Sequence, residues 1–185
     1  MSLNIGVFLG SNLGNDKEIF NFIKKFAEWF IKQNHTLIIG GTDSGLMQLL
    51  AKHVYKKVPV KAIYTSNAID PSKIYSYYTE LIIVNNSITK KKVFEEKSDL
   101  FIAFPGGVGT LDEIIDIINR NNLQEINKKL FLINDNNYWN KLNELLNCFK
   151  LKKFTHANLK NDNLIICDFD HFKREINKIN AKNKN

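Results

Sequence analysis

Residues 100–113 of this 185-residue chain read LFIAFPGGVGTLDE and carry the clearest indication of the fold. Its first part, Leu100–Phe104, is continuously apolar, as in strands that helices cover on both faces. A proline and three glycines follow in Pro105–Gly109, and a helical pattern begins at Thr110. Such glycines let backbone N–H groups approach an anion closely, and the following helix adds its positive N-terminal dipole. The stretch therefore predicts a strand, a phosphate-binding turn and a helix.

The same alternation of short apolar runs and longer helical segments extends over the chain. We predict seven strands at Ile5–Leu9, Thr36–Ile39, Val58–Tyr64, Glu80–Val84, Leu100–Phe104, Lys129–Ile133 and Leu164–Cys167. We predict six helices at Asp16–Gln33, Gly45–Lys56, Ser87–Lys97, Thr110–Asn122, Tyr138–Phe149 and Phe169–Asn180. This order is typical of an α/β fold: a Rossmann-like, doubly wound, mainly parallel sheet of about seven strands with helices on both faces.

Length and composition fit one domain over residues 1–185, because 44% hydrophobic residues suffice for a packed core and no Pro/Gly/Ser-rich linker interrupts the pattern. Residues from about 173 to 185 add lysine and asparagine without apolar periodicity beyond Ile179, so we expect a polar tail that can fray. The net charge of +7 favours a solvated basic surface. We expect no nucleic-acid partner, since no helix-turn-helix, zinc or aromatic RNA-binding signature accompanies the charge.

No basic segment followed by a long apolar stretch opens the sequence, and the apolar runs are far too short to span a bilayer. Cys148 and Cys167 have no CxxC spacing and no nearby histidine, so we expect small buried side chains in a reducing compartment. The four histidines are widely scattered: His35, His53, His156 and His171. We therefore expect a cytoplasmic protein with no membrane contact and no metal site.

Two other strand ends also carry small residues, and ligands of open parallel sheets bind where the strands end. The first predicted strand leads into Gly10-Ser11-Asn12-Leu13-Gly14, and the second leads into GGTDSGLM at 40–47. The first turn is not the GxGxxG dinucleotide fingerprint, and no GxxxxGK[ST] occurs in the chain. Thr110 and Glu113 also fit a capping box, in which both side chains only satisfy N–H groups at a helix start. The small residues before them favour the phosphate site.

Pro105–Glu113 matches PGGxGTxxE, which resembles the signature of the LOG family of cytokinin-nucleotide phosphoribohydrolases, often labelled "possible lysine decarboxylase". The chain is similar to that family in two further turns and in the strand before the signature, through Gly10-Ser11, Gly40-Gly41, Gly45-Leu46-Met47 and Ser98-Asp99 with Phe104. The resemblance runs from about Asn4 to Phe149. It implies hydrolysis of a nucleoside 5′-monophosphate, such as AMP or a cytokinin riboside monophosphate, to free base and ribose 5-phosphate.

The resemblance also implies a catalytic pair, an arginine and the last glutamate of the signature. That glutamate is Glu113. Counting back without a gap, the family's Arg–Lys pair falls on Lys90 and Lys91, so Lys90 replaces the catalytic arginine. Lysine keeps the charge but lacks the planar, bidentate fork of arginine. Two family glycines are replaced as well, by Thr42 and Gln48.

In this interpretation the phosphate lies over the signature turn, held by backbone N–H groups and the threonine hydroxyl. The residues expected to contact the ligand are Gly106, Gly107, Gly109, Thr110, Ser11, Gly41 and Lys91. Glu113 would face the ribose, where a carboxylate can stabilise charge at C1′ or orient water, and Lys90 would assist the departing base. No cofactor is required. Because family members assemble at least as dimers, we expect a homodimer or a higher homo-oligomer.

Two other functions stay open. The PGGxGT turn recurs in related Rossmann-like proteins that bind nucleotides or molybdenum cofactor without an obvious reaction. Lys90 favours such a binding role, whereas Glu113 favours hydrolysis. A lysine decarboxylase would need pyridoxal phosphate, a Schiff-base lysine and an acidic partner for the ring nitrogen, and nothing else in the sequence indicates that cofactor.

Overall fold

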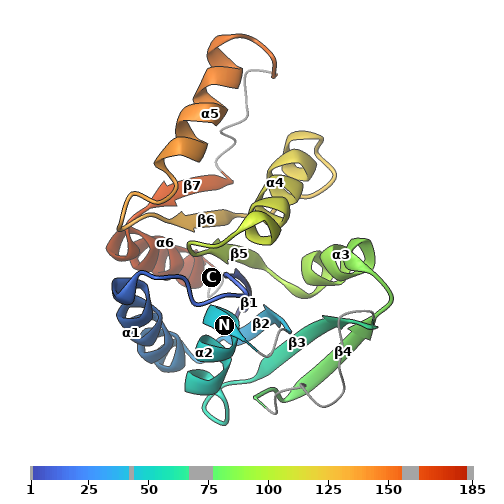
Figure 1. Ribbon diagram of the computed structural model, residues 1–185, viewed down its shortest axis with the longest axis vertical. Coiled ribbons are helices and arrows are strands. Elements are labelled where there is room, and N and C mark those ends of the chain that lie inside the picture. The colour runs from blue at the N-terminus through green and yellow to red at the C-terminus, as the bar shows by residue number, and fades with distance from the viewer. Residues whose placement is uncertain (1, 42–43, 67–76, 156–162, 183–185) are drawn as a thin grey trace.

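The computed structural model describes residues 2–41, 44–66, 77–155 and 163–182 (Figure 1). All seven predicted strands and all six predicted helices are present, with small shifts at their ends. The strands are β1 (Asn4–Phe8), β2 (Thr36–Gly40), β3 (Val60–Thr65), β4 (Glu80–Val84), β5 (Leu100–Ala103), β6 (Leu130–Ile133) and β7 (Leu164–Cys167). The helices are α1 (Lys17–Gln33), α2 (Gly45–Val54), α3 (Ser87–Lys97), α4 (Val108–Asn122), α5 (Asn140–Leu151) and α6 (Phe169–Lys182).

The strands form one sheet in the order β4-β3-β2-β1-β5-β6-β7, and every neighbouring pair is parallel. From β1 the chain moves outward to β4, and α3 then carries it back across β3, β2 and β1 to β5 on the other side (Figure 1). The direction of winding therefore changes between β1 and β5, where Ile5 pairs with Leu100 and Phe8 with Ala103. Ligands of such sheets bind beyond the carboxyl ends of the strands at this switch point.

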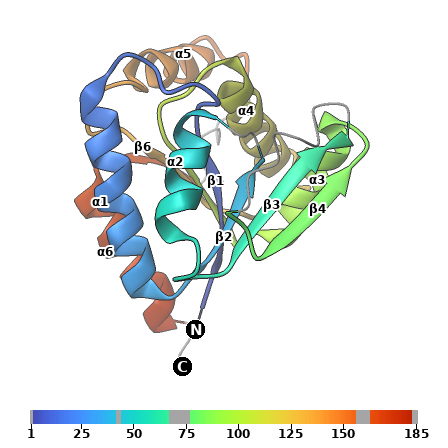
Figure 2. The same cartoon turned by 60° about the horizontal axis from the view of Figure 1, so that its bottom comes forward.

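Two apolar clusters hold the helices to the two faces of the sheet (Figure 2). Because side chains alternate along a strand, Ile102 of β5 joins the cluster under α1, α2 and α6, whereas Phe101 and Ala103 join the one under α3, α4 and α5. The predicted apolar stripe of α1 is core, with Phe26 and Phe30 fully buried. None of the helices in the described part of the chain is long and apolar enough to cross a bilayer.

The predicted helix Phe169–Asn180 is present as α6 and continues to Lys182, so residues 173–182 of the polar tail are helical. Phe172 and Ile176 are fully buried in this helix, and Ile179 packs against the same cluster. The three side chains recur at helical spacing among lysines and asparagines, so they form a narrow apolar stripe on one side of the helix. The low number of apolar residues in this segment gives little indication of that stripe. Residues 183–185 lie outside the described residues.

The two cysteines differ in their surroundings. Cys167, the last residue of β7, is buried, whereas Cys148 on α5 is only half-buried, and both are free thiols. The prediction of small buried side chains is therefore right for Cys167 and wrong for Cys148. Burial raises the pKa of Cys167 to about 12, with nearby carboxylates adding to the shift, so this thiol stays protonated at neutral pH.

Candidate functional site

The first two turns are tied together at the carboxyl edge of the sheet. Gly45 has φ +70°, and a Cβ on it would lie 2.3 Å from the backbone of Ser11, so only glycine fits there. The Ser44 hydroxyl donates a hydrogen bond of 2.8 Å to the Ser11 carbonyl. The N–H of Leu46 donates to the Gly10 carbonyl at 3.1 Å. The start of α2 thus fixes the loop that follows β1.

The third turn lies directly against the first. The position of a Cβ on Gly10 is 3.6 Å from the Cα of Gly106. A Cβ on Gly106 would in turn lie only 2.2 Å from the Thr110 hydroxyl oxygen, so the buried threonine folds back onto the turn. Phe104, just before the turn, is fully buried edge-on to Phe26 at 4.8 Å. Predicted residues Gly106, Thr110 and the Ser11 loop are therefore brought together.

The amino end of α4 offers backbone donors that no described side chain caps. The N-cap is Gly107, and the first bond of the helix runs from the N–H of Leu111 to the Gly107 carbonyl at 3.0 Å. The N–H groups of residues 107–110 precede this bond, so they are the donors that the helix end presents to an anion. A Cβ on Gly107 or Gly109 would meet no described atom within 4 Å. Among the described residues, none fills the space beside these two glycines.

The capping box predicted as an alternative for Thr110 and Glu113 is wrong. Because α4 begins at Val108, Thr110 lies inside the first turn and Glu113 lies beyond it. A capping box needs its Ser or Thr at the N-cap, a position that Gly107 occupies here. Glu113 has a different partner.

That partner is Lys90 on α3. The Lys90 Nζ lies 3.2 Å from Oε1 of Glu113, and the two side chains are 24% and 16% exposed. The same Nζ is 3.2 Å from the Cβ position of Gly40 and 5.7 Å from the centre of the Phe94 ring, so it lies over the end of β2. Burial raises the pKa of Glu113 above its ordinary value, although the charge and hydrogen bond of Lys90 oppose the shift. The structure thus brings the two predicted catalytic residues together.

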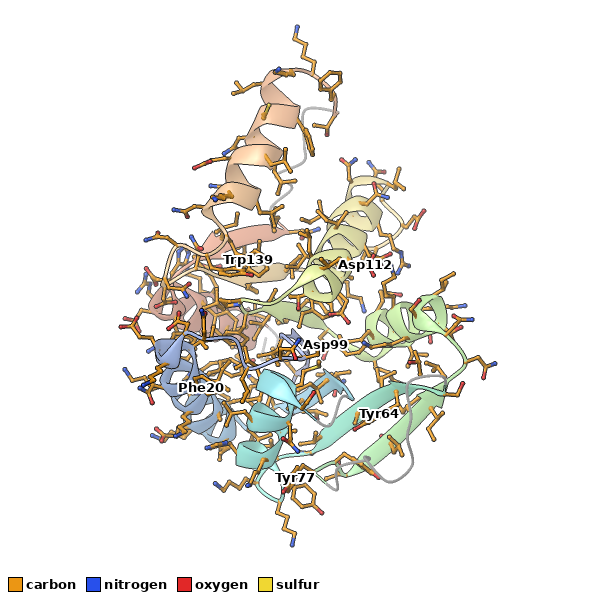
Figure 3. The ribbon with its side chains drawn as sticks, in the orientation of Figure 1. Phe20, Tyr64, Tyr77, Asp99, Asp112 and Trp139 are labelled. Carbon is orange, nitrogen blue, oxygen red and sulfur yellow. The ribbon has the colours of Figure 1, made fainter. Side chains whose placement is uncertain are left out.

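Lys91 points to other carboxylates of α4. Its Nζ lies 3.0 Å from Oδ1 of Asp112, which Figure 3 labels, and 3.6 Å from Oδ1 of Asp116. Burial lowers the pKa of Lys91, but the hydrogen bonds and charges of the two aspartates outweigh it, and the pKa is raised. Lys91 therefore bridges α3 and α4, while its contact with a phosphate stays a prediction.

Gly41 has a steric reason to be glycine. A Cβ there would fall 1.8 Å from a ring carbon of Tyr64, the residue labelled on β3 in Figure 3. Its N–H donates to the Ile63 carbonyl at 3.0 Å, so Gly41 continues the pairing of β2 with β3. Contact of Gly41 with a ligand stays a prediction. Thr42, one of the departures from the family pattern, lies outside the described residues, as does His156.

Tyr138 is a neighbour of the third turn that sequence reasoning missed. Its hydroxyl donates a hydrogen bond of 2.6 Å to the Gly106 carbonyl. The sequence predicted a helix from Tyr138, but α5 begins at Asn140, so Tyr138 lies in the preceding loop and reaches back to the turn. Since the two residues are 32 positions apart, no local pattern indicates this contact.

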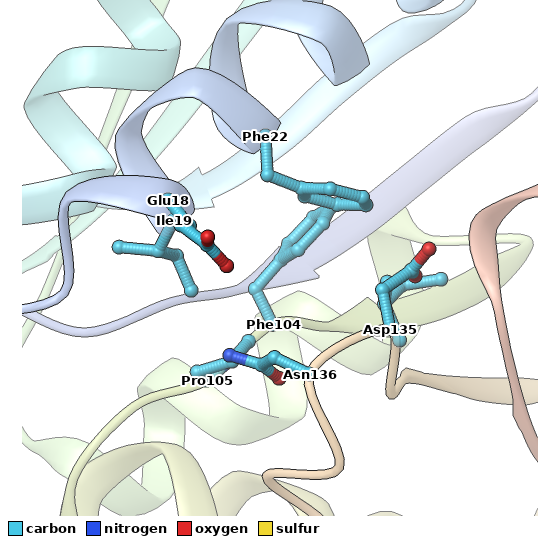
Figure 4. Close-up of a pocket in the computed structure, with 8 residues that line it drawn as sticks. Glu18, Ile19, Phe22, Phe104, Pro105, Asp135 and Asn136 are labelled. Atoms are coloured by element: carbon cyan, nitrogen blue, oxygen red, sulfur yellow. The ribbon is translucent and has the colours of Figure 1, made fainter.

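A pocket of about 140 Å³ adjoins the third turn on the face covered by α1 and α6 (Figure 4). Its lining residues are Glu18, Ile19, Phe22, Phe104, Pro105, Ile133, Asp135 and Asn136. Burial raises the pKa of Asp135, although a hydrogen bond from the Phe169 N–H opposes the shift. Pro105 belongs to both the pocket and the turn, whereas Glu113 lies on the other face of the sheet. Within the described ranges, no group of three or more His, Cys, Asp and Glu side chains could hold a metal ion.

Solved structures with the same fold include a molybdenum cofactor binding protein and a molybdenum cofactor carrier protein. A molybdenum cofactor binding protein from Rippkaea orientalis has a TM-score of 0.67 at 19% identity, covering 97% of this chain and 98% of that one. The molybdenum cofactor carrier protein of Chlamydomonas reinhardtii has a TM-score of 0.68 at 13% identity, covering 98% and 99%. At these identities the likeness concerns the fold alone.

Sequence similarity identifies the family. Residues 47–171 match the family model described as "Possible lysine decarboxylase". A cytokinin riboside 5′-monophosphate phosphoribohydrolase from Rhodococcoides fascians is 30% identical over 141 residues, or 75% of this chain and 71% of that protein. A protein of the same activity name from Arabidopsis thaliana is 31% identical over 137 residues, which make up 74% of this chain and 60% of the plant protein. The chain therefore belongs to the LOG family of phosphoribohydrolases, the family whose model is described as "Possible lysine decarboxylase".

Proposed function

We propose that this protein hydrolyses the N-glycosidic bond of a nucleoside 5′-monophosphate, of the AMP or cytokinin riboside monophosphate type, to free base and ribose 5-phosphate. The observation that carries the proposal is the ion pair between Lys90 of α3 and Glu113 of α4, with 3.2 Å between Nζ and Oε1. Glu113 lies on the helix that follows the glycine turn. The names of the relatives from Rhodococcoides fascians and Arabidopsis thaliana support this activity.

The phosphate end of the substrate is bound by the start of α4. Four backbone N–H groups at 107–110 precede the helical hydrogen bonds, and the helix dipole adds positive potential there. The Thr110 hydroxyl lies against Gly106 in the same turn. A dianionic phosphate satisfies these donors without the bidentate fork of an arginine, so the arginine replaced by Lys90 is not needed for this half of the site.

The reacting end of the substrate faces Glu113. As the bond to the base breaks, positive charge develops at C1′, and a carboxylate held in a mostly buried place stabilises that charge or orients the attacking water. The hydroxyl of the water adds to C1′, and its proton balances the negative charge that the departing base takes up. Lys90 holds the carboxylate in place and keeps a positive charge close to that base.

The test is base release from a panel of nucleoside 5′-monophosphates, followed by chromatography. The native protein should release base and ribose 5-phosphate from at least one of them, and Glu113→Ala should not. The matched control is Glu96→Ala, which removes a half-exposed carboxylate from α3 that pairs only weakly with Lys92 at 3.9 Å. Release that persists in Glu113→Ala would contradict the role of this carboxylate.

A second candidate is binding of a phosphate-bearing ligand without reaction. The molybdenum cofactor proteins of the same fold favour it, and so does the mutual neutralisation of Lys90 and Glu113. Binding of AMP with no base release from any monophosphate would support this role. The base-release panel thus separates the two candidates.

We also propose that the protein assembles as a homodimer through α4. Three apolar side chains, Val108, Leu111 and Ile115, are 84%, 38% and 40% exposed and follow one another at helical spacing. The opposite side of the helix, including Ile114 and Ile117, is buried against the sheet. A second copy would cover the exposed stripe beside the site. A hydrodynamic mass close to that of one chain would contradict the proposal.

A further inference from the structure

We infer that Tyr138 is a positioning residue for the phosphate turn: by holding the Gly106 carbonyl, its hydroxyl orients the Gly107 N–H toward the bound phosphate. The inference rests on the proposed phosphate site. It concerns a residue from the loop between β6 and α5, far in sequence from the signature. The hydrogen bond from the Tyr138 hydroxyl to the Gly106 oxygen is 2.6 Å long.

The geometry of the peptide group links this bond to the ligand. The carbonyl of Gly106 and the N–H of Gly107 belong to one planar peptide unit, and in a trans unit they point in opposite directions. A donor that holds the carbonyl on the Tyr138 side therefore directs the N–H away from Tyr138. That N–H is the first of the donors that the start of α4 leaves unbonded.

This peptide needs an outside support because both of its residues are glycines. Two glycines in sequence have many backbone conformations of similar energy, so the unit can rotate and turn its carbonyl toward the ligand. A carbonyl oxygen in that orientation would repel a phosphate. No described side chain packs against Gly107 where its own side chain would lie, since a Cβ there would meet no described atom within 4 Å. The hydroxyl of Tyr138 supplies the support from the other side.

The loop that carries Tyr138 is itself well fixed. The Asn134 side chain accepts the Trp139 N–H at 2.7 Å and donates to Asn140 at 2.8 Å. The Asn134 N–H is bonded to the Cys167 carbonyl of β7 at 2.9 Å. Trp139, labelled in Figure 3, is buried and packs edge-on against the Tyr138 ring at 4.9 Å. Tyr138 is therefore anchored through its backbone and ring, although its side chain is 48% exposed.

The hydrogen bond also strengthens the donor that it orients. A peptide group whose carbonyl accepts a hydrogen bond is polarised, and its N–H becomes a better donor. The effect acts only on ligands that carry the phosphate. Loss of the hydroxyl should thus weaken phosphate binding and leave the chemistry at Glu113 largely unchanged.

The test is Tyr138→Phe, which removes the hydroxyl and keeps the ring against Trp139. Calorimetry should give roughly 2- to 10-fold weaker binding of both AMP and ribose 5-phosphate, the effect of one hydrogen bond. KM for the monophosphate should rise by the same factor, with little change in kcat. The matched control is Tyr55→Phe, which removes a hydroxyl at the far end of α2 and should change neither value.

The outcomes separate this inference from the proposed reaction. Unchanged affinity of Tyr138→Phe for both phosphates, at an unchanged melting temperature, overturns the inference and leaves the hydrolase standing. A lower melting temperature with an equal loss of kcat and affinity assigns Tyr138 a general structural role and also overturns it. Selective loss of phosphate affinity in a chain that releases no base upholds the inference and overturns the hydrolase. No binding of either phosphate by the native protein overturns the phosphate site and the inference together.

Discussion

Lys90 of α3 reaches Glu113 of α4 at 3.2 Å from a point directly over Gly40, where any larger residue would meet its ammonium group. Both side chains are largely shielded from water, so each charge depends on the other. Removing one partner leaves the other buried without compensation. Burying two charges also costs desolvation free energy that an apolar pair of similar volume would avoid. A buried ion pair at this place therefore fits a role in chemistry better than a role in stability alone.

The pH dependence of stability should reveal the buried carboxylate. Burial raises the pKa of Glu113 above its ordinary value of 4.5, so between 4.5 and its folded value the folded state binds more protons than the unfolded state. The free energy of unfolding of the native protein should fall, relative to Glu113→Gln, as the pH rises through this window. Urea unfolding of both proteins from pH 4 to 7 measures the difference. A difference that grows in favour of the native protein would contradict the raised pKa.

Lys91 and Lys92 offer a matched comparison of a bridging and a solvated lysine. Lys91→Met removes the bridge to Asp112 and Asp116 and should cost about 1 kcal/mol of stability, since the pair is only partly exposed. Lys92→Met should cost about 0 to 0.3 kcal/mol, because Lys92 is 70% exposed and 3.9 Å from Glu96. Equal free energies of unfolding for the two variants would show that the bridge contributes nothing.

Alanine substitutions at Gly14 and Gly45, two glycines with positive φ, should distinguish the cost of backbone strain from the cost of a steric overlap. Gly14 has φ +73° with no described atom within 4 Å of a Cβ, so Gly14→Ala should cost about 1 kcal/mol from the backbone conformation alone. Gly45 has a similar φ of +70°, but its Cβ would overlap the backbone of Ser11. Gly45→Ala should therefore cost at least about 2 kcal/mol more, because the two turns must separate. Similar melting temperatures for the two variants would contradict the tie between the turns.

Gly109 should respond in opposite directions in stability and in binding. Its Cβ would meet no described atom, and alanine is favoured over glycine in a helix by about 0.5 to 1 kcal/mol, so Gly109→Ala should raise the melting temperature. The added methyl group would occupy the open space over the turn, and AMP binding should weaken about tenfold or more. Calorimetry and thermal unfolding measure the two effects. Unchanged AMP affinity would place the phosphate elsewhere.

The fold could be predicted from sequence because the signals are local. Continuous apolar runs such as Leu100–Phe104, and the apolar stripe around Phe26, indicate a strand or a helix from only a few neighbouring residues. The sequence also predicts α6, but Ile176 and Ile179 are sparse among polar residues, and only their packing against the sheet shows that they belong to the core.

For the candidate site too, the local motifs could be predicted from the sequence and the contacts between distant segments could not. Its glycine turns and Glu113 are visible as a motif, and Lys90 follows from counting along a family pattern. The role of Lys91 between two aspartates and the hydrogen bond from Tyr138 to Gly106 are contacts between distant segments, which no spacing in one sequence encodes. Exclusion of the capping box also required the structure, because it depended on where α4 begins.

The path of α3 gives the Lys90–Glu113 contact a further meaning. This helix is the crossover that carries the chain from β4, at one margin of the sheet, over β1 to β5 on the other side. Lys90 therefore belongs to the part of the chain before β5, and Glu113 belongs to the part after it. Their contact needs α3 and α4 packed together on β1, so a chain that ends before α4 lacks the proposed catalytic pair, and the proposed activity requires both helices in place.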